Sequence, residues 1–86
     1  MIKIRTGDGD ERREVQSVDR FNARGHDWAV HKGIAVEQFR VSHVGTGYGV
    51  PRSFADTVQE ARAKGEREIM AVDEAQFINI MAEAGR

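Results

Sequence analysis

Cysteine is missing from this chain of 86 residues, and proline occurs only once, at Pro51. Without cysteine the protein can hold neither a disulfide nor a thiolate, so histidine and carboxylate side chains are its only strong metal ligands. The sequence also lacks the run of roughly 20 apolar residues that crosses a bilayer, and Met1–Arg5 has no apolar signal-peptide core. We therefore expect a cytoplasmic protein with neither a membrane span nor a secretion signal.

The length limits the protein to one domain, residues 1–86, with a small core. A domain of this size hides only about 60% of the surface that its unfolded chain exposes. Its stability should therefore be modest unless a partner or a second copy covers more apolar surface, and a homodimer is one expected arrangement.

The charges nearly balance, with a net charge of −1, which argues against a protein built mainly to hold phosphates. Residues 1–53 carry nine Lys and Arg against seven Asp and Glu, a net +2, whereas residues 54–86 carry four against seven, a net −3. The first part is thus mildly basic and the second acidic, an asymmetry that could orient a charged partner.

Alternating apolar and polar residues predict strands in the first part of the chain. We expect strands at Ile2–Arg5, Glu14–Val18, Asp27–Lys32 and Phe39–Val44. A turn at 6–10 would join the first two, and Asp19–Asp27, which has no clean period, is expected to be a loop. Trp28 should lie on a buried strand face, and the segment 34–36 either continues that strand or turns a corner.

A glycine turn and a first helix are expected after the last of these strands. Glycines at 45, 47 and 49 would let Tyr48–Val50 fold back as a short return strand. Ser53 or Asp56 would then cap a helix of about ten residues that ends before Gly65. Residues 66–72 are predicted to form a last strand.

Asp73 marks the start of a second helix, with Gln76 three residues later as in a capping box and Val72 placed to contact Phe77. Gly85 is expected to end it. Its apolar stripe comprises Phe77, Ile80, Met81 and Ala84, with Ile78 widening it.

The order of strands before helices predicts an α+β fold, in which two short helices pack on one face of an antiparallel sheet of three or four strands. The other face of the sheet should then be solvated or used for binding. A doubly wound parallel sheet would need roughly 30 residues for each crossover unit, which this chain cannot supply.

Two motifs resemble ligand loops but lack essential parts. The turn at 45–49 follows a strand and precedes a helix, yet it lacks the third glycine of a dinucleotide fingerprint and the Lys of a phosphate loop. Asp8–Glu11 resembles the start of a calcium loop without its closing glutamate. An ordinary glycine turn and a carboxylate-rich hairpin turn are the favoured interpretations.

Histidine chemistry rests on three residues, His26, His31 and His43. If their strands pair, His31 and His43 could neighbour each other and hold zinc together with Asp27, but neither a His-x-x-x-His pattern nor a tight cluster supports this. No serine or threonine stands in a nucleophile motif. We therefore expect neither an enzyme nor a bound cofactor or metal, and interpret the histidines as strand residues with local hydrogen bonds.

The best candidates for binding are Arg40 and Ser42, which share one face of the strand 39–44, together with Lys32 and Arg52 at nearby strand ends. On an exposed sheet face, such side chains could contact a protein partner or enter a nucleic-acid groove. Few aromatic residues are present to stack on bases, and acidic residues offset the basic ones.

Part of this sequence resembles a pattern in small phage and prophage accessory proteins. The matching parts are the strand Trp28–His31, the segment Val41–Val50, Phe54 and a short helix that contains Ala61. The resemblance covers residues 27–65. It implies a compact protein that binds a protein or ribonucleoprotein complex of a host, as anti-CRISPR inhibitors do. The preferred hypothesis is thus a non-enzymatic protein-binding module, and the alternative is a small nucleic-acid-binding module that uses the outer sheet face.

Overall fold

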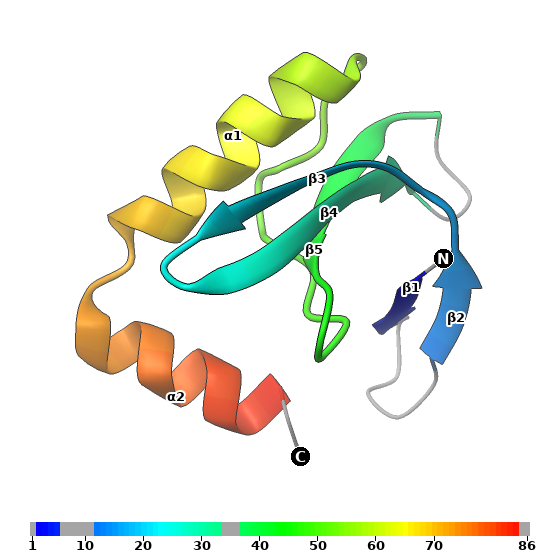
Figure 1. Cartoon of the computed structure of the whole chain (residues 1–86). Coiled ribbons are helices and arrows are strands. Elements are labelled where there is room, and N and C mark those ends of the chain that lie inside the picture. The colour runs from blue at the N-terminus through cyan, green and yellow to red at the C-terminus, as the bar shows by residue number, and fades with distance from the viewer. Residues whose placement is uncertain (1, 6–11, 34–36, 85–86) are drawn as a thin grey trace.

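The computed structural model describes residues 2–5, 12–33 and 37–84, and within them it shows an α+β fold (Figure 1). The elements in chain order are β1 (Ile2–Arg5), β2 (Arg12–Val15), β3 (Ser17–Ala23), β4 (His26–Lys32), β5 (Phe39–His43), α1 (Val58–Ala71) and α2 (Glu74–Ala84). Strands β1 and β2 form a two-stranded antiparallel sheet, and the other three form an antiparallel sheet in the order β3-β4-β5. The predicted class is confirmed, although the strands divide between two sheets.

The hairpin β3–β4 occupies the stretch where we expected a loop, so the prediction for Asp19–Asp27 is wrong. Phe21 pairs with Trp28 across the hairpin, and the strands turn at Arg24 and Gly25 with φ angles of 53° and 77°. Positive φ at both central residues is the type I′ geometry that suits the twist of a two-residue hairpin. The glycine at the second position accepts this conformation without strain.

Helix α1 is longer than predicted and runs through Gly65. Thr57 rather than Ser53 or Asp56 caps it, because the Thr57 hydroxyl accepts a hydrogen bond from the Glu60 amide at 3.1 Å. Gly65 is buried in the middle of the helix. The predicted helix stop and the predicted strand over 66–72 are therefore both wrong.

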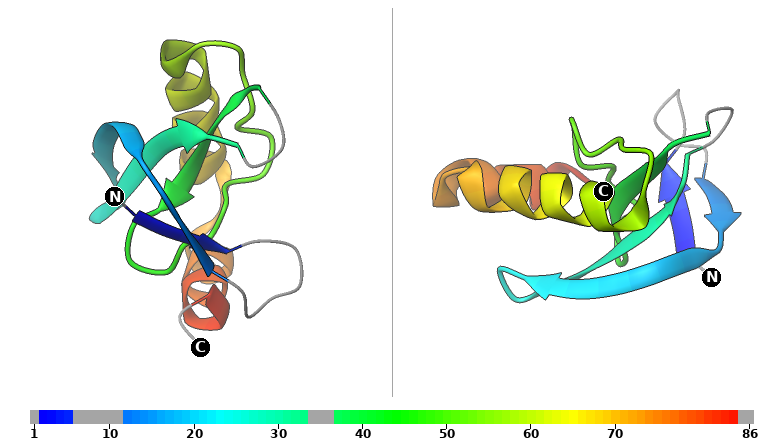
Figure 2. Two further views of the ribbon diagram at one scale, coloured as in Figure 1. Left: turned by 90° about the vertical axis from the view of Figure 1, so that its right-hand side faces the viewer. Right: turned by 90° about the horizontal axis from the view of Figure 1, so that it is seen from above.

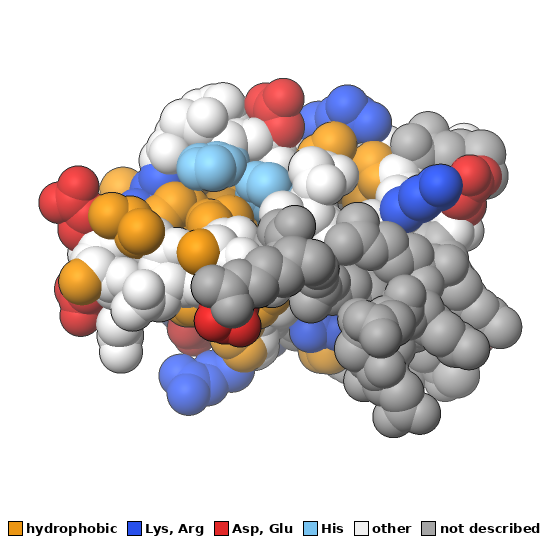
Figure 3. All heavy atoms as spheres, turned by 90° about the horizontal axis from the view of Figure 1, so that it is seen from below, with side chains coloured by type: hydrophobic (Ala, Val, Ile, Leu, Met, Phe, Trp, Pro, Cys, Tyr) orange, Lys and Arg blue, Asp and Glu red, His pale blue; other side chains and the backbone are white. Residues whose placement is uncertain are grey.

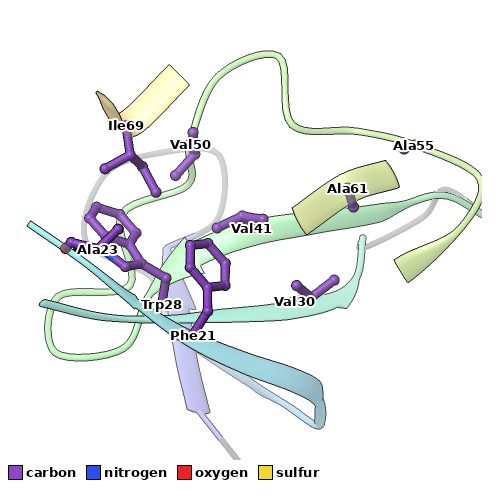
Figure 4. Close-up of a cluster of buried hydrophobic side chains, with 9 residues drawn as sticks. All are labelled: Phe21, Ala23, Trp28, Val30, Val41, Val50, Ala55, Ala61 and Ile69. Carbon is purple, nitrogen blue, oxygen red and sulfur yellow. Dashed lines mark hydrogen bonds between the residues drawn. The ribbon is translucent and has the colours of Figure 1, made fainter. Parts of the chain in front are cut away.

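The core lies between the three-stranded sheet and α1. Trp28 and Val41 point from the strands towards α1, where Ile69 meets them (Figure 4). The opposite face of the sheet is covered by β1–β2, because Ile4 packs against Ala29 in a second buried cluster. Figure 2 shows β1–β2 and α1 on opposite sides of the sheet. The expected solvated face is thus largely covered.

Three predictions fall outside the described residues. They are the turn at 6–10 with its calcium-like Asp8–Glu11, the segment 34–36, and the helix stop at Gly85.

Candidate functional site

Helix α2 leaves its apolar stripe only half covered. Its start is as predicted, since the Asp73 carboxylate accepts a hydrogen bond from the Gln76 amide at 2.9 Å. Of the described helix, only Ala84 is buried, whereas three buried residues anchor α1. Phe77, Ile80 and Met81 are half-buried. An amphipathic helix with this much apolar surface in contact with water is typical of an interaction surface.

A groove separates α2 from the chain that returns after β5. The return is as predicted, since the His43 amide donates to the Tyr48 carbonyl at 2.8 Å and the Val50 amide donates to the Val41 carbonyl at 2.9 Å. The groove has about 400 Å³ of empty space, part of it open to solvent. Its lining comprises Trp28, Tyr48, Val50, Pro51, Glu68, Ile69, Val72, Phe77, Ile80 and Met81.

The groove extends along α2, because a shallower hollow lined by Tyr48, Ile80 and Glu83 adjoins it. We call the two hollows together the α2 groove. Two charged side chains line the α2 groove, Glu68 and Glu83, and both are acidic. Helix α2 itself carries no Lys or Arg. Figure 3 shows hydrophobic side chains gathered on this side of the molecule, with both acidic and basic side chains around them. An apolar groove with acidic edges favours a partner that is apolar and basic.

Two histidines lie next to the α2 groove. His26 Nδ1 is 2.9 Å from His43 Nε2, and the His26 ring contacts the Phe77 ring of α2 with centroids 5.4 Å apart. The Thr46 amide donates to His43 Nδ1 at 3.0 Å, so this nitrogen carries no proton. His43 Nε2 must then carry the proton and donate it to His26 Nδ1. The contacts thus assign the proton of neutral His43 to Nε2.

Burial lowers the pKa of His43, and the nearby His26 lowers it further, while Asp27 acts in the opposite direction. A second proton would have to enter either the His26–His43 hydrogen bond or the bond from Thr46. Both sites already hold a donor hydrogen. His43 is therefore held neutral by geometry as well as by burial.

His31 and Ser42 form a separate pair beneath β1–β2. His31 Nδ1 donates to the Lys32 carbonyl at 2.8 Å, so Nε2 accepts from the Ser42 hydroxyl, also at 2.8 Å. This is the bonding pattern of a serine and its general base, but His31 is 0% and Ser42 1% exposed. Burial lowers the pKa of His31, and nearby Arg40 lowers it further. We interpret the pair as a satisfied polar contact inside the fold.

The four residues predicted to bind a partner are spread over different surroundings. Ser42 is buried, so the prediction that it faces solvent is wrong, because β1–β2 covers its side of the sheet. Arg40 is half-buried, with its guanidinium 4.9 Å from the centroid of the Phe54 ring. Lys32 pairs with Glu37 at 3.2 Å, and Arg52 lies 3.7 Å from Glu68 at the edge of the α2 groove.

Sequence reasoning identified the apolar stripe of α2 but not the groove. The groove combines α2 with Trp28, Tyr48 and Pro51, residues that are 20 or more positions away along the chain. The expected neighbours His31 and His43 lie apart, because β5 places Arg40 opposite His31 and His43 opposite Trp28. No group of three or more histidine or acidic residues that could hold a metal occurs in the part of the chain that is described.

Comparisons with models of protein families, with curated proteins and with solved structures found no match to this chain. Within residues 2–5, 12–33 and 37–84, neither helix has the length and apolar character needed to cross a membrane.

Proposed function

We propose that this protein is a non-enzymatic protein-binding module and that the α2 groove is its binding surface. The observation that carries the proposal is the half-covered stripe of Phe77, Ile80 and Met81 beside a groove that the half-buried Tyr48 also lines. Large aromatic side chains in a groove are typical anchors of protein interfaces. The buried Ser42–His31 pair, inaccessible to a substrate, gives no comparable support to catalysis.

The partner best suited to this groove is a segment that presents apolar side chains together with Lys or Arg. The apolar lining would cover leucine-like or aromatic side chains, as in the recognition of an amphipathic helix. The carboxylate of Glu68 at the groove edge would attract such a cation in competition with Arg52, which lies 3.7 Å from it.

The biological role that we propose is inhibition or modulation of a host protein or ribonucleoprotein complex, as the phage-protein resemblance implies. A nucleic-acid-binding module remains the alternative, and Arg40 is the observation in its favour. Lys32 and Arg52, the other two cations, already have carboxylate neighbours at 3.2 and 3.7 Å. A cation with an acidic neighbour contributes less to phosphate binding.

The proposal can be tested with two synthetic helical peptides that share one leucine spacing, one with lysines and one with glutamates on the polar face. Fluorescence anisotropy should show the Leu–Lys peptide binding with a Kd of about 1 to 100 μM and the Leu–Glu peptide at least tenfold more weakly. Ile80→Asp should weaken binding of the Leu–Lys peptide at least tenfold.

Ile78→Asp is the matched control, because Ile78 lies on the same helix, is 59% exposed and does not line the groove. It should leave the affinity within about twofold of wild type, since exposed substitutions away from a site usually have small effects. Equal losses in both variants, or no binding of either peptide, would contradict the proposal. A wild-type homodimer that Ile80→Asp separates would assign the groove to a second copy and would also contradict it.

A further inference from the structure

Arg40 is a half-buried charged side chain that has no counter-ion among the residues that the structure describes. Its Nε atom is buried and has no hydrogen-bond partner, the sole such side-chain atom among the residues that the structure describes. Burial lowers the pKa of Arg40, and the neighbouring Tyr48 phenol acts in the opposite direction. No described carboxylate lies within ion-pair distance of it. A buried and unpaired polar group in a native fold calls for an explanation.

Two residues, Gly49 and Phe54, lie close to the guanidinium of Arg40. A Cβ atom placed on Gly49 would lie 2.5 Å from both Cζ and Nη2 of Arg40 and 3.0 Å from Nε. These distances place Gly49 over the flat face of the guanidinium, because a position beside its edge would be nearer to the nitrogens than to Cζ. The Phe54 ring, 4.9 Å from Cζ, lies against the guanidinium as well. Gly49 has no side chain, so the guanidinium can occupy this narrow space.

The two Nη atoms are the part of the guanidinium that could contact a ligand. The Nη atoms of Arg40 have no hydrogen-bond partner in the described residues, and unlike Nε they are not buried. These two nitrogens present parallel N–H donors, the arrangement that a planar carboxylate accepts with both oxygens.

We propose that Arg40, whose guanidinium contacts Gly49 and Phe54, is a binding site for a carboxylate of a protein partner. The inference rests on the proposed function only in assigning the carboxylate to a protein. The carboxylate would accept two hydrogen bonds from the Nη atoms and supply a negative charge that no described residue places beside Arg40. Tyr48 lines the α2 groove and also lies near Arg40, so the two sites adjoin, and the variants Ile80→Asp and Gly49→Ala test them separately.

The probe for this site is sodium acetate, titrated against sodium chloride at constant ionic strength. The readout is the Nε–Hε signal of Arg40 in ¹H–¹⁵N spectra, identified by its loss in Arg40→Lys. We expect a saturable shift with half-saturation at about 10 to 100 mM acetate, the range of a single charge-assisted contact. Gly49→Ala should abolish saturation, because its methyl group would collide with the guanidinium while the positive charge is kept.

Arg52→Gln is the matched control and should leave the acetate response unchanged, since Arg52 already has Glu68 as a neighbour. A linear response that is the same in wild type and Gly49→Ala would overturn the proposal. If inorganic phosphate or duplex DNA bound at least tenfold more tightly than acetate, the proposal would be overturned in favour of a phosphate site. Acetate binding at Arg40 does not require the α2 groove. This site can therefore be confirmed even if the Leu–Lys peptide fails to bind, and the peptide can bind even if acetate does not.

Discussion

A Cβ atom on Gly65 would lie 2.5 Å from Cγ2 and 2.8 Å from Cβ of Val41, distances that real side chains do not adopt. Helix α1 therefore approaches β5 as closely as a glycine allows. Gly65 lies in the interior of α1, where glycine is normally unfavourable by about 1 kcal/mol relative to alanine. The close contact between the helix and the sheet explains why a glycine stands there.

Gly65→Ala is expected to destabilise the protein, against the direction that helix propensity predicts. Overpacking of a well-filled core costs about 1 to 3 kcal/mol, which exceeds or equals the gain in propensity. Val41 is β-branched and stiff, so it cannot turn away cheaply. Urea unfolding would measure the change in free energy.

Ala63→Gly in the same helix provides the control, because Ala63 is exposed and should lose only about 1 kcal/mol of propensity. The double variant Gly65→Ala with Val41→Ala should lose less stability than the two single variants combined, since the second change removes the methyl groups that collide. A stabilised Gly65→Ala protein would show that the helix does not approach the strand this closely.

Arg24 connects the β3–β4 turn to both helices. Its guanidinium donates to the carbonyls of Ile69 and Val72 at the end of α1 and stacks over the Phe77 ring of α2 at 4.4 Å. Arg24→Asn should keep the positive-φ turn, which asparagine tolerates, while it loses these contacts. We expect the free energy of unfolding to fall by about 1.5 to 3 kcal/mol, the usual effect of losing hydrogen bonds to a charged group.

The corresponding control is Arg20→Asn, an exposed position on β3 whose loss should change stability by less than about 0.5 kcal/mol. Equal effects of the two changes would mean that Arg24 does not hold the helices in place. Thermal unfolding followed by circular dichroism would compare the variants.

Local signals in the sequence predicted the elements that local interactions determine. The Asp73 cap, the alternation around Trp28 and the glycine return at 45–49 each specify their structure over a few residues. The prediction that the helix ends before Gly65 was wrong, because a glycine that ends a helix and a glycine that permits close packing cannot be distinguished in the sequence. Strand β3 was missed because its buried residues, Phe21 and Ala23, make too short an alternation to distinguish from a loop.

The candidate site was harder to predict because long-range packing creates it. The apolar stripe of α2 could be identified from its spacing, but nothing local indicates that Tyr48 and Trp28 would form the facing wall. The burial of Ser42 depends on where β1–β2 packs, which the strand alternation cannot specify. Arg40 was identified as a candidate, but its enclosure by Gly49 and Phe54 required the structure.

Stability is expected to decrease as the pH falls below about 6.5, the ordinary pKa of histidine. Folding lowers the pKa values of His31 and His43. Below pH 6.5 the unfolded chain therefore binds more protons than the folded chain does. The stabilisation is complete above pH 6.5 and is lost as the pH falls towards the lowered values, by no more than about 1.4 kcal/mol per pH unit for each histidine.

Urea unfolding at pH 7.5, 6.5 and 5.5, at one ionic strength, would measure this loss. The range lies above the ordinary pKa values of carboxylates, so histidines dominate the change. NMR titration of the imidazoles should place the midpoints of His31 and His43 below 6.5. An unfolding free energy that stays constant or rises between pH 7.5 and 5.5 would contradict the tautomer assignments.

The most direct test of the central claim is a ¹H–¹⁵N spectrum of the wild-type protein titrated with the Leu–Lys peptide. Binding in the α2 groove predicts the largest shifts at the Trp28 indole N–H and at the amides of Tyr48, Asn79 and Ile80, with the Lys32 amide unaffected. Shifts concentrated instead around Lys32 and β3, or spread evenly over the protein, would show that the α2 groove is not the binding surface.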